Sequence, residues 1–157
     1  MAGGSSATSV SGSTRAGVGI LSGFVANIAM MFSIFVLTSL GLLQLSWLPM
    51  IGSIFGASGA SQELALSGLA WFVLVGMIAG LIFAFAWKRP TLVEGIMVGE
   101  LGLLVLGIVL SVVSVPQLSG TILSMSLGDS LALIVPLAVC FAVWGLTAGF
   151  VGKECMK

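Results

Sequence analysis

Long apolar stretches separated by short polar interruptions dominate the pattern of this chain. Four of these stretches cover residues 17–43, 64–87, 92–113 and 131–151. Each is close to the ~20 residues that a helix needs to cross a ~30 Å hydrocarbon core. The pattern therefore predicts an all-α fold, a bundle of four transmembrane helices that occupies residues 15–152 as one domain.

The two ends of the chain lie outside this pattern. Residues 1–14 are rich in Gly, Ser, Thr and Ala, so we expect a disordered cytoplasmic tail there, and residues 153–157 form a second short tail. A basic residue before an apolar run can also mark a signal peptide. The first apolar stretch is about twice the ~7–15 residues of such a peptide, which favours an uncleaved first helix.

The segments that join the first helix to the second and the third to the fourth are apolar for loops. They cover about residues 41–63 and 114–129, and Pro49 and Pro116 lie near their fronts. The apolar composition of each segment favours a short helix that lies in the membrane interface. A re-entrant loop is the alternative, because bent backbone is tolerated at membrane depth only where protein or water surrounds it.

Composition supports a membrane protein and removes several function classes. Hydrophobic residues make up 59% of the chain, charged residues 6%, and the mean hydropathy is +1.27. A soluble domain of this size could not bury so much apolar surface. The formal net charge of zero argues against nucleic-acid binding. The chain has no histidine, so it cannot bind a metal through imidazole or use imidazole as a general base. We therefore expect that the protein is not an enzyme and that it binds neither a metal nor a cofactor.

The basic residues determine the expected orientation in the membrane. They are Arg15, Lys88, Arg89, Lys153 and Lys157, and each lies at the same side of the predicted bundle. Lys and Arg near span ends are retained in the cytoplasm. We therefore expect a multi-pass protein of the plasma membrane with both termini cytoplasmic.

Glycines recur four residues apart in every predicted helix. The pairs are Gly19 and Gly23, Gly76 and Gly80, Gly95 and Gly99, and Gly145 and Gly149. Glycines at this spacing share one helix face and let a neighbouring backbone approach closely, so we predict a tightly packed bundle. The first pair echoes the third and the second echoes the fourth. This indicates two parallel two-helix repeats, although chance recurrence among 22 glycines is the alternative.

Two polar residues within the predicted spans are the candidates for function. Glu100 lies about nine residues into the third span, ~13 Å below the inner surface, and Asn27 lies at a comparable depth in the first. An ionisable residue at such depth is a functional-site hypothesis by default. Asn27 could hydrogen-bond to Glu100 if their helices touch. The pair would then either join two helices or handle protons or ions.

The other acidic residues have structural explanations. Thr91 followed by Glu94 before an apolar run is the pattern of a capping box. Glu63 and Asp129 precede the second and fourth helices, where negative charge complements the helix dipole. Cys140 and Cys155 lie some ~22 Å apart along one helix, too far for a disulfide.

The glycine pairs, Asn27, the Leu48-Pro49 dipeptide and Trp144-Gly145 together resemble an uncharacterised family of small four-helix integral membrane proteins of archaea and bacteria. The resemblance covers most of the chain and implies the same four-helix fold. Members of that family often carry histidine at the positions of Trp71 and near Phe141, and those histidines are missing here. Any metal or cofactor role that they support in the family is therefore in doubt for this chain.

Two functions remain open at this point. The first is a structural or accessory subunit of a larger membrane complex, which the lack of a soluble domain and the packing motifs favour. The second is a conduit for a small solute or ion that uses Glu100 and Asn27. Because four helices are few for a transporter, the second function implies a homo-oligomer. The lipid bilayer is the partner in both.

Overall fold

The computed structural model describes residues 11–43, 48, 52, 58–87, 91–112 and 127–155. Its regular elements in these ranges are all helices, which confirms the all-α prediction. They are α1 (Gly12–Ser39), α3 (Ser61–Ala86), α4 (Leu92–Val112) and α6 (Leu127–Cys155).

Three segments are long and apolar enough to cross a membrane, namely Gly12–Ser39, Ser61–Ala86 and Ile134–Cys155. This confirms the membrane class. The fourth helix, α4, has 21 residues and a rise of about 31 Å at ~1.5 Å per residue. Its crossing of the membrane stays a prediction, as do the positions of the termini relative to the cytoplasm.

Helix α1 begins earlier than the apolar pattern predicts. Its first residue is Gly12, so residues 12–14 are helical, although they fall within the expected disordered tail. The cause is a side-chain cap, because the Ser11 hydroxyl accepts a hydrogen bond from the Thr14 amide at 3.3 Å. A serine cap satisfies one of the free donors at a helix start, and this requires no apolar residue.

Helix α6 also extends past its predicted end. It continues to Cys155, so Lys153 lies in the last helical turn rather than in a tail. A cation there complements the negative end of the helix dipole. At the other end α6 begins at Leu127, which places Asp129 inside the helix instead of before it. Glu63 likewise lies in the first turn of α3.

The start of α4 confirms the predicted capping box. The Glu94 carboxylate accepts hydrogen bonds from the Thr91 amide and from the Thr91 hydroxyl, both at 2.8 Å. In return the Glu94 amide donates to the Thr91 hydroxyl at 3.2 Å. Two backbone donors at the helix start are thereby satisfied, so the role of Glu94 is structural.

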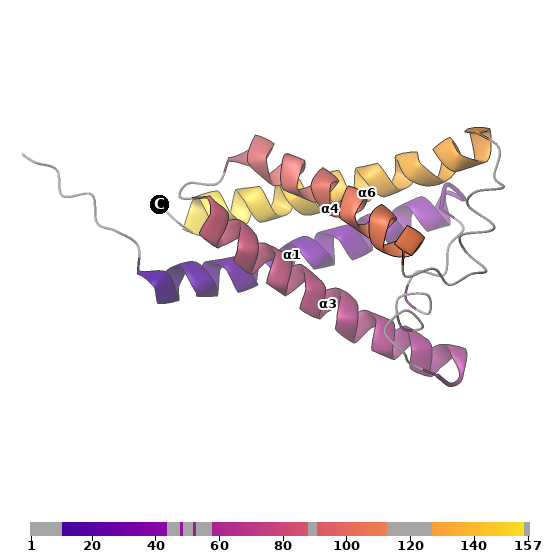
Figure 1. Cartoon of the computed structure of the whole chain (residues 1–157), viewed down its shortest axis with the longest axis horizontal. Coiled ribbons are helices and arrows are strands. Elements are labelled where there is room, and N and C mark those ends of the chain that lie inside the picture. The colour runs from indigo at the N-terminus through magenta and orange to yellow at the C-terminus, as the bar shows by residue number, and fades with distance from the viewer. Residues whose placement is uncertain are drawn as a thin grey trace, which may run out of the picture.

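Helices α1 and α6 form the middle of the packing. Helices α1 and α4 both pack against α6, and α3 packs against α1. The start of α1, the end of α3, the start of α4 and the end of α6 lie at one end of the molecule (Figure 1). Adjacent helices in each half of the chain are therefore antiparallel.

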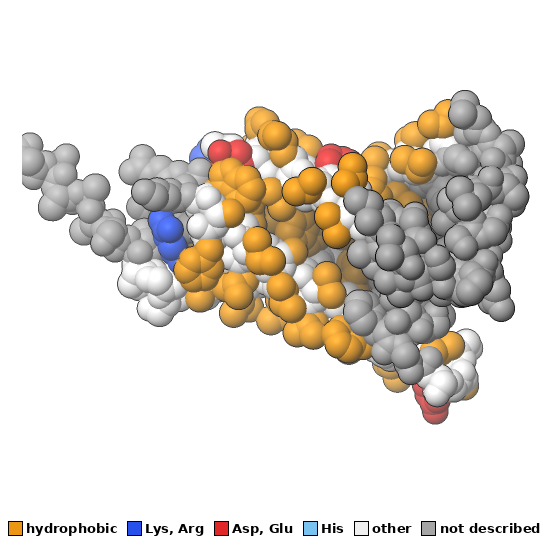
Figure 2. All heavy atoms as spheres, viewed as in Figure 1, with side chains coloured by type: hydrophobic (Ala, Val, Ile, Leu, Met, Phe, Trp, Pro, Cys, Tyr) orange, Lys and Arg blue, Asp and Glu red, His pale blue; other side chains and the backbone are white. Residues whose placement is uncertain are grey.

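The outer surface is apolar where it is described. Apolar side chains cover most of the described part of the face in Figure 2. Phe32 and Phe35 of α1, for example, are 68% and 69% exposed. Large apolar side chains with this much exposed surface are stable in hydrocarbon. In water they would cause the protein to associate. The surface thus agrees with a chain surrounded by lipid.

Candidate functional site

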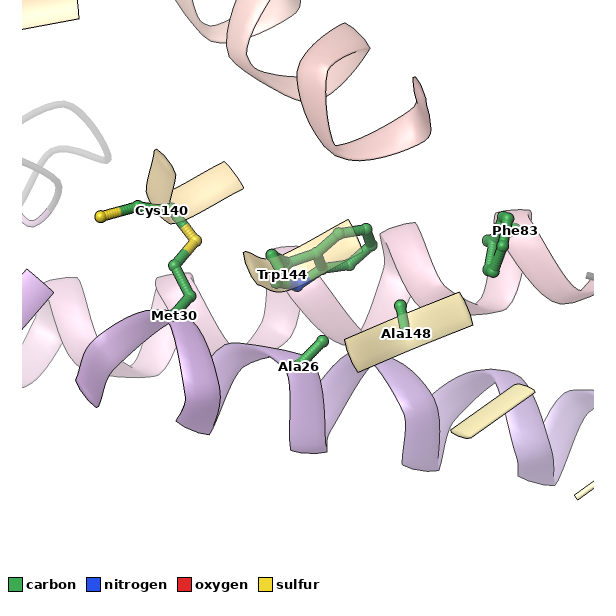
Figure 3. Packing of buried hydrophobic residues seen from close by; sticks show 6 residues of the cluster. All are labelled: Ala26, Met30, Phe83, Cys140, Trp144 and Ala148. Atoms are coloured by element: carbon green, nitrogen blue, oxygen red, sulfur yellow. The ribbon is translucent and has the colours of Figure 1, made fainter. Parts of the chain in front are cut away.

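The buried core forms where α1, α3 and α6 meet. Six buried residues make up its main cluster, labelled in Figure 3: Ala26, Met30, Phe83, Cys140, Trp144 and Ala148. The Met30 side chain extends toward Cys140, and the Trp144 ring lies next to Ala26 in that view. Trp144 is a core residue with one polar atom, the indole N–H, and a buried N–H of this kind needs a partner.

Asn27 of α1 supplies that partner. Its side chain is only 3% exposed, and its Oδ1 accepts a hydrogen bond from Trp144 Nε1 at 2.9 Å. Its Nδ2 donates to the carbonyl oxygens of Phe72 at 2.9 Å and Val73 at 3.3 Å. One amide side chain therefore joins α1 to both α3 and α6.

Gly76 makes room for this amide on α3. A Cβ added at Gly76 would overlap the Asn27 amide group. The Phe72 carbonyl lies one turn before Gly76 on the same helix, so the missing side chain also opens that carbonyl to a donor from outside. Asn27 and Gly76 therefore form one unit, in which a polar side chain reaches the backbone of the neighbouring helix.

The glycine pairs of the first half lie where α1 and α3 are closest. A Cβ at Gly23 would overlap the Gly76 carbonyl, and one at Gly80 would overlap the Gly19 carbonyl. At Gly19 the added atom would lie 2.8 Å from the Leu81 Cα. Such distances place backbone directly against backbone, where dispersion contacts are densest. The hydroxyl of the buried Ser22 bonds within α1, because it donates to the Gly19 carbonyl of its own helix at 2.9 Å.

Glycines also bring α4 and α6 together in the second half, in a register shifted by one helical turn from that of α1 and α3. A Cβ at Gly95 would overlap the Gly145 carbonyl, and one at Gly99 would overlap the Phe141 carbonyl. At Gly149 the added atom would lie 2.9 Å from the Thr91 carbonyl oxygen. The glycines that recur four apart in sequence thus all face a neighbouring helix.

Glu100 lies apart from Asn27. It is half-buried on α4, whereas Asn27 faces α3 and α6 and all its hydrogen bonds go to those helices. The hydrogen bond between Asn27 and Glu100 that the sequence suggested is not formed, because α1 packs against α3 and α6 rather than against α4. Within the described ranges, no hydrogen bond or ion pair involves the Glu100 carboxyl.

The remaining sequence candidates fall into two groups. Arg15 and Lys153 lie at the end of the molecule that holds the start of α1 and the end of α6, whereas Lys88, Arg89 and Lys157 lie outside the described residues. No group of three or more His, Cys, Asp or Glu in the described part of the chain could hold a metal ion.

Between residues 43 and 58 of the first outer segment, the structure describes two positions. Leu48 and Gly52 are helical, and both contact the first part of α3. A Cβ at Gly68 would overlap the Leu48 carbonyl, and one at Gly52 would overlap the Leu64 carbonyl. Pro49, Pro116 and the choice between interfacial and re-entrant segments lie outside the described residues.

Comparison with known proteins found no matching family model, no similar curated protein and no similar solved structure. The family resemblance rests on glycines, apolar residues and Asn27.

Proposed function

We propose that this protein is a structural or accessory subunit of a larger complex in the plasma membrane. The observation that carries the proposal is the set of hydrogen bonds made by Asn27, whose side-chain amide lies in the core. Both its nitrogen and its oxygen are engaged with other helices of the same chain. A side chain used in this way stabilises helix packing and is not free to bind a solute.

The packing of the core supports the same role. Core residues such as Ala26, Cys140 and Ala148 have no exposed surface, and glycines bring the backbones of paired helices together. A conduit through the chain needs polar groups that face an aqueous path. The polar groups that lie deepest among the described residues, Asn27 and Ser22, instead bond to backbone or to Trp144.

The proposed arrangement in the membrane has four crossings with both termini in the cytoplasm. The positive-inside rule supports it, and so does the position of Arg15 and Lys153 at one end of the molecule. We also propose that the halves are repeats. In support, α1 pairs with α3 and α4 pairs with α6 through glycines at equivalent spacing.

An experiment on the purified full-length protein tests the subunit role. The tagged chain is extracted from its native membrane in a mild detergent, and the ratio of each co-eluting protein is measured by quantitative mass spectrometry. We expect a second protein in a fixed ratio that survives changes of detergent. Recovery of this chain alone, under conditions in which it stays folded, would contradict the proposal.

Glu100 supports a second candidate, a conduit formed by several copies. The carboxyl is half-buried on α4 and has no partner within the described residues, and such a group can relay protons or cations. In vesicles that contain the purified protein, this function predicts a proton or cation leak that Glu100→Gln abolishes. Equal leak rates in protein-containing and empty vesicles would eliminate it.

A further inference from the structure

Helix α4 has a second face that the described residues of this chain leave uncovered. Val93, Met97, Glu100 and Leu104 follow one another at intervals of four, three and four residues. Residues at these intervals form a continuous seam along one side of a helix, which we call the α4 seam. Val93, Met97 and Leu104 are 66%, 66% and 59% exposed. The seam is about opposite the face whose glycines, Gly95 and Gly99, contact α6.

Glu100 makes this seam unsuited to lipid. A carboxylate in the hydrocarbon region costs several kcal/mol, and even a neutral carboxyl needs a hydrogen-bond partner. The chain itself offers no cation at that depth. Its basic residues all lie at the ends of the apolar stretches, and the two that are described, Arg15 and Lys153, belong to the first turn of α1 and the last turn of α6.

We propose that the α4 seam packs against the α4 seam of a second copy of this chain, with the two Glu100 side chains paired. Copies inserted in the same orientation are related by an axis along the membrane normal, and this axis keeps every residue at the depth of its counterpart. The residue that meets Glu100 across the axis is therefore the partner's Glu100. The second copy supplies a polar group at the required depth whatever the tilt of the helices.

The chemistry of two carboxyl groups suits such a contact. When the pair shares one proton, the protonated carboxyl donates a hydrogen bond to the other, and one charge is removed. A single polar residue in an otherwise apolar seam also specifies register, because any shift leaves it unpaired in apolar surroundings. The inference does not depend on the proposed function, since a subunit or a conduit could pair in this way.

Disulfide cross-linking in membranes tests the interface. Single cysteines are placed at Met97 or Leu104 in a full-length chain that carries Cys140→Ala and Cys155→Ser. Cysteine pairs form disulfides only when their Cβ atoms lie about 4 Å apart. We expect oxidation to give covalent dimers from both seam positions. Val105→Cys is the matched control, because Val105 is 50% exposed on α4 but lies about a quarter of a turn round the helix from Leu104, outside the seam. It should stay monomeric.

Substitution of Glu100 tests the pairing itself. Dimer fractions are measured in vesicles by single-molecule photobleaching over a range of protein-to-lipid ratios. Glu100→Gln keeps the ability to hydrogen-bond and should leave dimerisation close to the original. Glu100→Leu should weaken it about threefold to thirtyfold, the measured range for interhelical hydrogen bonds in membranes.

Several results would overturn the proposal. These are a monomer at all densities, cross-linking that is as efficient at Val105 as at the seam, or equal dimerisation of the Glu100→Leu variant. Helical content and a single elution peak verify folding of each variant. If one seam variant does not fold, Val93→Cys takes its place, because Val93 belongs to the same seam.

Discussion

Loss of the Asn27 side chain is the perturbation that most directly probes the three-helix core. In Asn27→Ala the donations to the Phe72 and Val73 carbonyls disappear. The indole N–H of Trp144 stays buried without its acceptor. The two carbonyls keep their partners within α3, so the unpaired indole N–H is the larger cost.

The expected magnitude follows from these contacts. Hydrogen bonds between membrane helices contribute about 0.6 kcal/mol each on average, so the two donations account for about 1 kcal/mol. A buried donor without a partner costs about 1–3 kcal/mol. We therefore expect Asn27→Ala to lower the free energy of unfolding by about 2–4 kcal/mol.

A double-mutant cycle isolates the contact between α1 and α6. Asn27→Ala, Trp144→Phe and the double variant are unfolded with SDS in mixed micelles, and helicity is followed by circular dichroism. The coupling energy should be about 1–3 kcal/mol, because the cost of the unpaired indole is present in Asn27→Ala and absent from the double variant. Ser33→Ala is the control, because the Ser33 hydroxyl bonds only to the Ala29 carbonyl of its own helix. Additive effects of Asn27→Ala and Trp144→Phe would refute the contact.

Further predictions concern the glycines and the cysteines. Gly23→Ala should destabilise the protein by at least 1 kcal/mol, because its Cβ would overlap the Gly76 carbonyl. Gly17→Ala on the same helix should be neutral or stabilising, since nothing lies within 4 Å of the added atom. An equal loss in both variants in SDS unfolding would exclude close packing as the cause. A membrane-impermeant maleimide should label the exposed Cys155 only after the cell membrane is permeabilised, and the buried Cys140 only after unfolding. Labelling of intact cells at Cys155 would place the C-terminus outside.

Features that depend on local sequence were predictable for this chain. The capping box at Thr91 and Glu94 involves residues three apart and formed as expected. The apolar length of a helix is also a local property, so the helical class and the membrane class followed from it. The start of α1 was missed because its signal is a single serine, Ser11, within a segment whose composition resembles a flexible tail.

Features that depend on which helices touch were not predictable in the same way. Asn27 could be selected as a lone amide in an apolar span, but its partner is set by the packing of α1 on α3 and α6. Trp144 could not be identified as a polar-site residue, because a tryptophan in an apolar run has the same sequence pattern as any other core residue. Its need for an acceptor was the one available signal, and the spacing of 117 residues gives no indication that Asn27 is that acceptor.

Hydrogen exchange at the Trp144 indole tests the central claim, that the polar core is closed and structural. The four indole N–H resonances of the chain are recorded by NMR in bilayers after transfer to deuterated water. Trp144 should retain its proton for hours, and its resonance should move in Asn27→Ala. Exchange within minutes in the unaltered protein would place water beside Asn27 and contradict a structural role for this core.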